Sequence, residues 1–174
     1  MDRFIDRTRR HLVAAGIGAA LGTAGGATAV AAQATRTTAA SLAGRPRREN
    51  IIPPELQNVY DRFHYAPAVR IGDILYISGQ IGRDAAMKVV EDPEAQMIQA
   101  WRNVETVLTF AGLGFEDVFE LETWFVDFRK HLPAFLKIKD QFIKTNYPTW
   151  TGFGITEFST PGILCEIKVN AMYL

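Results

Sequence analysis

The sequence predicts an α+β domain in which a mixed sheet carries two helices on one face, with the elements in the order β-β-α-β-α-β-β. Three observations predict it. Two segments repeat apolar residues with the period of a helix, from Pro93 to Ala111 and from Pro133 to Thr145. Runs rich in β-branched and aromatic residues precede, separate and follow these segments. Glycine and proline turn signals lie between consecutive elements.

The N-terminal 34 residues have the pattern of an export signal. Residues 12–32 carry no charge and contain nine alanines and five glycines. The segment 8–13 (TRRHLV) precedes this run and is typical of a twin-arginine signal, and residues 32–34 (AQA) suit signal peptidase. We therefore expect residues 1–34 to be a signal peptide and the mature protein to be periplasmic or otherwise exported, without stable membrane insertion. An uncleaved anchor, a transit peptide and a mis-assigned start are the alternatives, and an unused signal would leave the protein cytoplasmic.

Residues 35–50 are polar and rich in Arg, Ala and Thr, which predicts a flexible linker. The domain is expected over residues 51–174. It should open with a hairpin of strands at 66–70 and 74–78, because the intervening Ile71-Gly72-Asp73 is a turn signal. Residues 79–91 are expected to be a loop or a short irregular strand.

The first long helix is predicted to have Asp92 as its N-cap, Pro93 at its first position and Gly112 at its end. One apolar face is formed by Met97, Trp101, Val104, Leu108 and Ala111.

A strand follows over Val118–Val126, and its alternate residues Phe119, Leu121, Thr123 and Phe125 are expected on one side. Pro133 is expected to start the second helix, whose apolar face is formed by Phe135, Ile138 and Phe142. The last two strands are predicted at 150–156 and 163–171, with Pro161-Gly162 as the turn between them. Because both helices cover one sheet face, the other face is expected to pack against another copy of the chain.

Composition excludes several functions. The chain has 19 basic and 19 acidic residues, and removing residues 1–34 leaves 15 basic and 17 acidic ones. Nucleic acid is not an expected partner, because there is no basic stripe. Cys165 is the single cysteine, so an intramolecular disulfide and a cysteine-based zinc site are excluded. The three histidines form no ligand cluster in the sequence, and we predict no metal and no other cofactor.

Several short motifs occur in the order and spacing of a known family. Tyr65 precedes the first predicted strand, and Ser78-Gly79-Gln80-Ile81 follows the second. Ala111-Gly112 and Asp117-Val118 flank the joint between the first long helix and the next strand, and Glu166 lies on the last strand. Over residues 60–171 the chain resembles the Rid (RidA/YjgF, reactive intermediate/imine deaminase) family. The resemblance implies the chorismate-mutase-like fold of that family and a homotrimer with small-molecule sites in clefts between subunits.

The resemblance also implies roles for individual residues. Glu166 occupies the position of the family's acidic residue, which helps to position water for attack on an imine carbon. Gly152 occupies the position of a backbone N–H donor to the substrate carboxylate, and Tyr65 and Ser78 are expected to line the pocket. Structural roles are the alternatives, namely a carboxylate that accepts hydrogen bonds for Glu166 and a strand end for Ser78.

The family's carboxylate-binding arginine is replaced here by Trp150, in the segment Tyr147-Pro148-Thr149-Trp150-Thr151. This segment resembles the YjgH-type branch, which lacks the arginine. An indole has one N–H donor and no charge, so it cannot hold a carboxylate as a guanidinium does. Trp150 is expected either to stack on a planar ligand or to pack in the core or a subunit contact. Arg83 is the best-placed replacement cation, and a solvated surface arginine is the alternative.

The sequence leads to two main hypotheses of function. The first is a hydrolase (deaminase) of an imine, an enamine or a related small planar metabolite, in which Glu166 handles water. The second is a trimer that binds small molecules without turnover or acts as a scaffold. Chorismate mutase activity is disfavoured, because that reaction needs several cations around a dicarboxylate.

Overall fold

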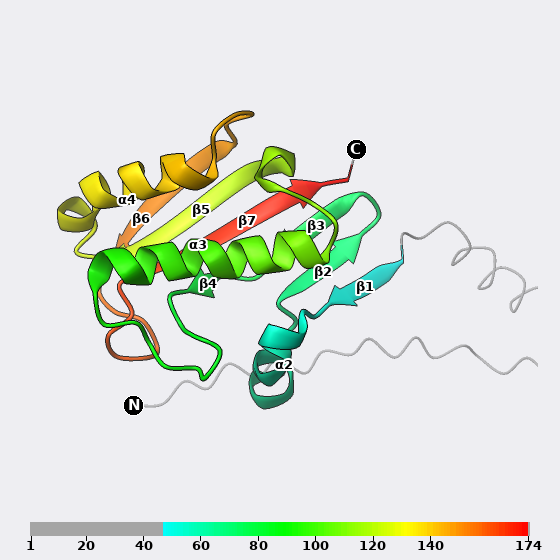
Figure 1. Ribbon diagram of the computed structural model, residues 1–174, viewed down its shortest axis with the longest axis horizontal. Coiled ribbons are helices and arrows are strands. Elements are labelled where there is room, and N and C mark those ends of the chain that lie inside the picture. The colour runs from blue at the N-terminus through cyan, green and yellow to red at the C-terminus, as the bar shows by residue number, and fades with distance from the viewer. Residues whose placement is uncertain (1–46, 174) are drawn as a thin grey trace, which may run out of the picture. The chain divides into compact units, whose positions relative to one another are not determined.

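The computed structural model describes residues 47–173, and these fold around one mixed seven-stranded sheet of order β1-β2-β3-β7-β5-β6 (Figure 1). The short strand β4 pairs with β7 beyond the end of β3, and only β5 and β6 run parallel. The strands are β1 (Arg48–Ile51), β2 (Ala68–Ile71), β3 (Ile74–Ile77), β4 (Gln80–Ile81), β5 (Val118–Val126), β6 (Thr149–Ile155) and β7 (Cys165–Met172). The helices are α2 (Gln57–Phe63), α3 (Pro93–Phe110) and α4 (Phe128–Phe142), with 3-10 turns η1 (Pro54–Leu56) and η2 (Phe115–Asp117).

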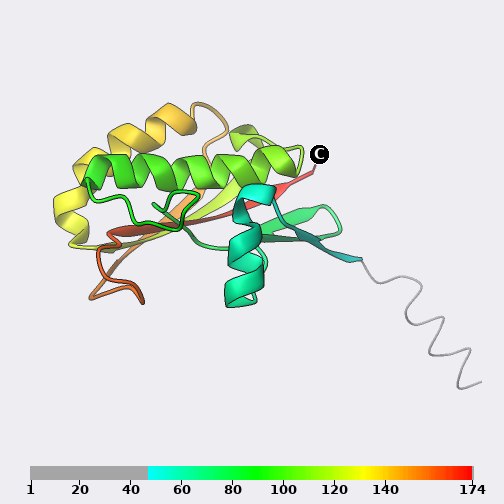
Figure 2. The ribbon, with the colours of Figure 1, turned by 60° about the horizontal axis from the view of Figure 1, so that its bottom comes forward.

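The predicted fold class is confirmed. Helices α3 and α4 lie side by side on one face of the sheet (Figure 2), and the seven predicted elements occur in the predicted order. The start of α3 follows its sequence signals, because the Asp92 carboxylate accepts a hydrogen bond from the Ala95 N–H at 2.8 Å. Strand β5 has the predicted bounds. The homotrimer stays a prediction.

An aromatic cluster forms the core between α3, α4 and the sheet. The fully buried Trp101 ring stacks on Phe135 and Phe142, with centroids 5.9 and 5.6 Å away, and meets Phe115 edge-on at 5.8 Å. Phe125 of β5 meets Phe135 edge-on at 4.9 Å. The aromatic face of α4 thereby fixes how this helix sits over β5 and β6.

Two predicted boundaries are wrong. Helix α4 begins at Phe128, and Pro133 lies inside it. Pro133 is exposed, and its ring removes a single backbone donor early in the helix, which the packing of Phe135 and Ile138 offsets. The linker predicted over 35–50 ends too late, because residues 48–50 belong to β1, which pairs with β2.

One expected side-chain orientation is also wrong. Leu121, Thr123 and Phe125 face the helices as predicted, whereas Phe119 is 38% exposed. The pairing of β5 with β7 shifts by one residue between Val118 and Glu120, and such a bulge interrupts the alternation of side chains.

The sheet face opposite the helices is more polar than the sequence suggested. Lys168 Nζ and Glu122 Oε2 lie 2.7 Å apart, and Asn170 Nδ2 donates to Glu120 Oε2 at 2.5 Å. Apolar contacts flank these pairs, such as the stacked rings of Trp124 and Phe153 at 5.8 Å.

The predicted signal peptide of residues 1–34 lies outside the described residues, as does the linker up to residue 46. Between residues 47 and 173, no helix has both the length and the apolar composition needed to cross a bilayer.

Candidate functional site

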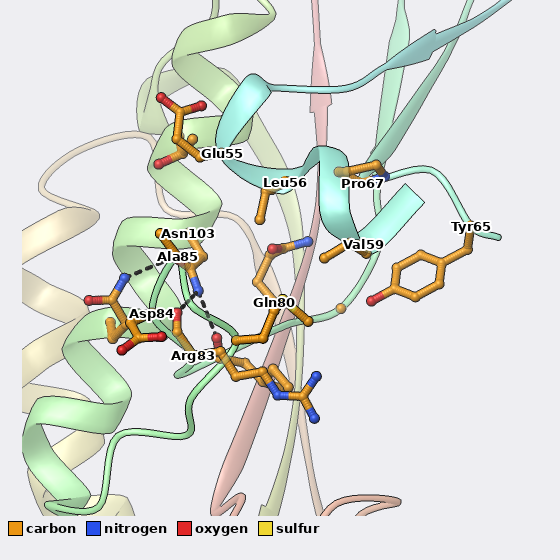
Figure 3. A pocket seen from close by; sticks show the side chains of 15 residues that line it. Glu55, Leu56, Val59, Tyr65, Pro67, Gln80, Arg83, Asp84, Ala85 and Asn103 are labelled. Carbon is orange, nitrogen blue, oxygen red and sulfur yellow. Dashed lines mark hydrogen bonds between the residues drawn. The ribbon is translucent and has the colours of Figure 1, made fainter. Parts of the chain in front are cut away.

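A cavity of about 180 Å³ lies between α2, the segment 79–87 that follows β3, and α3 (Figure 3). Leu56 and Val59 approach it from η1 and α2, Gln80 and Arg83 from the opposite wall, and Tyr65 from the loop before β2. The remaining lining residues are Glu55, Pro67, Gly79, Ile81, Asp84, Ala85, Met87, Gln99, Asn103 and Thr106.

Two of the residues predicted from the sequence, Tyr65 and Arg83, line this cavity, and the carboxylate of a third, Glu166, lies against Gly79 of its wall. Burial raises the pKa of the Tyr65 hydroxyl, the nearby Arg83 guanidinium lowers it, and the Glu166 carboxylate raises it. Both charges therefore act on the same phenol. Burial also raises the pKa of the Glu166 carboxyl above its ordinary value of 4.5. A phenol and a guanidinium thus line the cavity, and a partly buried carboxylate lies beside it.

The position of Glu166 follows from the alternation of β7. Its neighbours Cys165 and Ile167 are fully buried under the helices, so Glu166 projects from the other face of the sheet. Its carboxylate lies against the backbone of Gly79, where a Cβ atom would overlap Glu166 Oε1 and Cδ. Glycine is therefore required at 79 for this carboxylate to sit beside the cavity. Cys165 faces the core as predicted, and burial raises its pKa to about 12.

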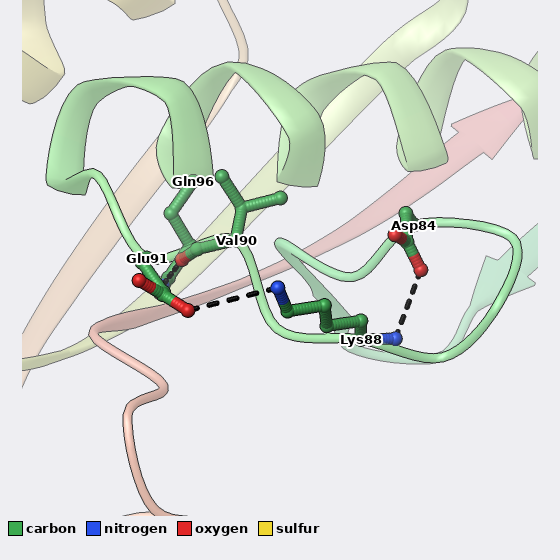
Figure 4. Close-up of polar contacts among 5 residues, drawn as sticks. All are labelled: Asp84, Lys88, Val90, Glu91 and Gln96. Atoms are coloured by element: carbon green, nitrogen blue, oxygen red, sulfur yellow. Dashed lines mark hydrogen bonds and ion pairs between the residues drawn. The ribbon is translucent and has the colours of Figure 1, made fainter.

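The loop that carries Arg83 is anchored at both ends (Figure 4). The Lys88 backbone N–H donates to Asp84 Oδ1 at 2.9 Å, and Lys88 Nζ lies 3.7 Å from Glu91 Oε1. The fully buried Gln96 of α3 donates to the carbonyls of Val90 at 2.7 Å and Gly162 at 2.9 Å, and accepts from the Leu164 N–H at 2.6 Å. Gln96 thereby ties the Arg83 loop and the loop before β7 to the same helix.

Arg83 uses one of its side-chain donors within the protein. Its Nη2 donates to Thr160 Oγ1 at 2.6 Å, which orients the guanidinium. Its buried Nε has no hydrogen-bond partner among residues 47–173. Arg83 is the one cation among the described residues that line this cavity.

Ser78 has a structural contact in this structure. Its hydroxyl donates to the Ala66 carbonyl at 2.8 Å and so joins the end of β3 to the loop that carries Tyr65. This hydrogen bond fits the structural role at a strand end that was the alternative for Ser78, and it positions Tyr65 indirectly.

Trp150 and Gly152 do not reach the cavity within one chain. Their strand β6 is separated from β7 by β5, and Trp150 lies on the face of the sheet that the helices cover. Its indole N–H donates to Thr123 Oγ1 at 3.0 Å, and its ring packs on Phe135 with centroids 5.8 Å apart. A Cβ atom on Gly152 would lie 2.7 Å from Cζ of Phe128. Within the described chain Trp150 packs on Phe135 and remains 36% exposed, and both of its expected roles stay predictions.

Replacing Trp150 with phenylalanine is expected to lower the free energy of unfolding by about 1–2 kcal/mol, because the hydrogen bond to the buried Thr123 hydroxyl is lost. Chemical denaturation measures this change. The matched control is Trp124→Phe on the opposite face, where the retained ring still stacks on Phe153. An equal loss in both variants would show that the hydrogen bond contributes nothing.

Sequence reasoning missed Gln96, Asn103 and the need for glycine at 79. Asn103 Nδ2 donates to the carbonyls of Ile81 and Arg83 at 2.8 and 3.0 Å, so it holds the backbone of the cavity wall. A polar residue at a buried position of the α3 face was the available signal, since a buried amide needs partners outside its own helix.

Known proteins share the sequence pattern and the fold of this chain. The model of the family described as "Endoribonuclease L-PSP" matches residues 57–173. The RutC family protein YjgH of Escherichia coli is 30% identical over 125 residues, which are 71% of this chain and 94% of that protein. A 2-iminobutanoate/2-iminopropanoate deaminase of Dermatophagoides farinae is 30% identical over 97 residues, 53% of this chain and 73% of that protein. A solved structure described as protein YJGH superposes with a TM-score of 0.67 at 28% identity and covers 72% of this chain and 95% of that one.

Proposed function

The chain belongs to the endoribonuclease L-PSP (YjgF/Rid) family, and on that premise we propose that it hydrolyses 2-imino acids, with Arg83 as the carboxylate anchor and Glu166 as the group that activates water. The observation that carries the proposal is that Tyr65 and Arg83 line one cavity and the Glu166 carboxylate lies against Gly79 of its wall. The deaminase relative from Dermatophagoides farinae supports the reaction class.

The charges of the site suit a protonated 2-imino acid. Such a molecule carries a carboxylate and, next to it, an iminium nitrogen. The Arg83 guanidinium matches the carboxylate with a charge-assisted hydrogen bond. The Glu166 carboxylate, which lies beside the cavity against Gly79, attracts the iminium end. In this arrangement Arg83 takes the role of the arginine that Trp150 replaces.

The proposed reaction consumes one water. Glu166 accepts a proton from the water as its oxygen forms a bond to the imine carbon. The proton then passes to the nitrogen. As the carbon–nitrogen bond breaks and the carbonyl of the 2-oxo acid forms, Glu166 takes the hydroxyl proton and passes it to the departing ammonia, which leaves as ammonium. Glu166 ends the cycle as a carboxylate, so no oxidant, metal or further reactant is needed. A carboxyl whose pKa is raised by burial is a stronger base than an exposed one, which suits this task.

Cleavage of RNA is not supported by the charge distribution. Residues 47–173 contain 13 basic and 17 acidic side chains, and the cavity has Glu55 and Asp84 at its walls beside the single cation. A polyanion gains affinity from many lysine and arginine contacts. The proposal is therefore limited to a small metabolite.

Replacing Arg83 with methionine is expected to lower kcat/KM for 2-iminobutanoate by a factor of about 10–100, mainly through KM, because a charge-assisted hydrogen bond contributes about 1.5–3 kcal/mol. Ammonia release from freshly generated substrate measures this. Arg102→Met, at an exposed position of α3, is the matched control. An unchanged KM in the Arg83 variant would remove Arg83 from substrate binding. Stabilisation of the chain by 2-oxobutanoate without any turnover would favour a non-catalytic binding protein.

A further inference from the structure

We propose that Trp124 is a positioning residue for Glu166, because its indole ring covers the side of the Glu166 carboxyl that faces β5 and holds water away from it. This inference rests on the proposed function, since it concerns the group that activates water at the same site. Trp124 itself is not a lining residue of the cavity, so it acts through Glu166 and not on the substrate.

The sheet places Trp124 beside Glu166. The antiparallel pairing of β5 with β7 sets these two residues directly opposite each other. Such residues project from the same face of the sheet, with Cβ atoms about 4.5–5.5 Å apart. On the other side of β7, Ile81 of β4 is the residue opposite Glu166. The Glu166 side chain therefore stands between an indole from β5 and an apolar side chain from β4.

The indole of Trp124 turns one of its faces toward this carboxyl. Its ring stacks on Phe153 of β6, with centroids 5.8 Å apart and an angle of 18° between the planes. Because the two rings are nearly parallel, Phe153 covers one face of the indole and leaves the other free. Strands β6 and β7 lie on opposite sides of β5 (Figure 1), so the free face is directed toward β7 and Glu166.

An indole face in this place changes the acidity of the carboxyl. It offers neither charge nor hydrogen-bond donor, because the single N–H of the indole lies at its edge. A carboxyl that loses contact with water on one side ionises less readily, and burial is the cause of the raised pKa of Glu166. In another hydrolase a tryptophan beside the catalytic carboxyl has the same effect. Trp124 thereby makes Glu166 a stronger base.

The cations near Glu166 are engaged elsewhere and do not cancel this effect. Lys168 projects from the same face of β7, two residues along, but its ammonium lies 2.7 Å from Glu122 Oε2 of β5. Arg83 follows β4, and its guanidinium donates to Thr160 Oγ1 at 2.6 Å. Between residues 47 and 173, no lysine or arginine forms an ion pair with Glu166.

The other titratable groups around Glu166 keep one charge state while it titrates. Burial raises the pKa of Tyr65 above 10.0, against the effect of the Arg83 charge and together with that of Glu166. Burial and the Glu166 charge raise the pKa of Cys165 to about 12. Strands β4 and β6 contain no titratable side chain. A change in the acidity of Glu166 can therefore be measured without interference from these neighbours.

The test measures the pKa of Glu166 by carbon-13 NMR of the full chain labelled at the glutamate carboxyl carbons, with the signal assigned through Glu166→Gln. Trp124→Ala should lower this pKa toward 4.5 by about one unit, because water then reaches the carboxyl. Trp124→Phe keeps a ring in this place and should lower the pKa by a smaller amount. Phe153→Ala is the matched control, since it removes the same stacking contact and leaves the indole beside Glu166.

The dependence of imine hydrolysis on pH gives a second measurement with the same variants. Glu166 acts as a base only when it is ionised, so kcat falls as the pH drops through its pKa. In Trp124→Ala this fall should move to lower pH by the same amount as the pKa in the NMR titration, and in Phe153→Ala it should stay in place. A purely structural role of Trp124 would lower kcat equally at every pH.

The outcomes separate this inference from the function on which it rests. An unchanged Glu166 pKa in Trp124→Ala, or equal shifts in Trp124→Ala and Phe153→Ala, would overturn the role of Trp124 while leaving the hydrolase proposal intact. A lowered pKa without hydrolysis of any imine by the wild type would overturn the proposed function, because the NMR titration needs no turnover. If Trp124→Ala does not fold, Trp124→Thr gives the same comparison with a residue that suits a strand.

Discussion

Replacing Glu166 with glutamine is expected to lower kcat for imine hydrolysis by a factor of about 100–10,000, because an amide cannot accept the proton of the attacking water. The two side chains have the same shape, so glutamine fits in the same place against Gly79. KM should rise less than in Arg83→Met, since the carboxylate of the substrate is assigned to Arg83 and Glu166 only attracts the iminium end. Steady-state ammonia release measures both constants. Undiminished kcat would remove Glu166 from the mechanism.

The Glu166→Gln variant should also change how the stability of the protein depends on pH. Burial raises the pKa of Glu166, so the folded chain binds more protons than the unfolded chain in the interval between 4.5 and that raised pKa. The stability that protonation contributes is therefore complete below pH 4.5 and is lost as the pH rises through the folded-state pKa. Glutamine does not titrate. Thermal unfolding should show Glu166→Gln to be more stable than the wild type at pH 7, with the difference shrinking toward pH 4. A difference that grows toward acid pH would contradict the burial of this carboxyl.

Replacing Gln96 with leucine is expected to lower the free energy of unfolding by at least about 3 kcal/mol. The change leaves the carbonyls of Val90 and Gly162 and the N–H of Leu164 without partners, and each unsatisfied buried group costs about 1–3 kcal/mol. Because Gln96 anchors the Arg83 loop, KM for the imine should also rise. Chemical denaturation and the ammonia assay measure the two effects.

The matched control for Gln96 is Gln141→Leu, at an exposed position of α4 where the amide makes one 3.4 Å contact with the Lys137 carbonyl. The control should stay within about 0.5 kcal/mol of the wild type. If both glutamine variants lose the same small amount of stability, the buried network does not determine the position of the two loops.

The regular elements of the fold were predictable because their signals are local. The Asp92-Pro93 start of α3 and the alternation of β5 depend on neighbouring residues alone. The start of α4 was missed because tertiary packing of Phe135 and Ile138 outweighs the local effect of Pro133. The bulge that exposes Phe119 depends on the register with β7, which a single strand does not encode. Helix α2 is short, and its seven residues give too little periodicity to recognise.

The candidate site was predictable in part for a similar reason. Glu166 and Tyr65 were found through a resemblance of motifs, and their proximity to Arg83 depends on β4 pairing with β7. Gln96 and Asn103 carried no motif, and their importance arises from backbone groups that are distant in the sequence. The place of Trp150 under α4 follows from which face of β6 the helices cover, and this is a tertiary property.

The most direct test of the central claim is the hydrolysis of freshly generated 2-iminobutanoate by the purified protein, compared with the spontaneous rate in the same buffer. The account predicts that the wild type accelerates ammonia release and that Arg83→Met and Glu166→Gln both lose most of this acceleration, the first through KM and the second through kcat. A wild-type rate equal to the spontaneous one would contradict the assignment of Arg83 and Glu166 as a hydrolytic site.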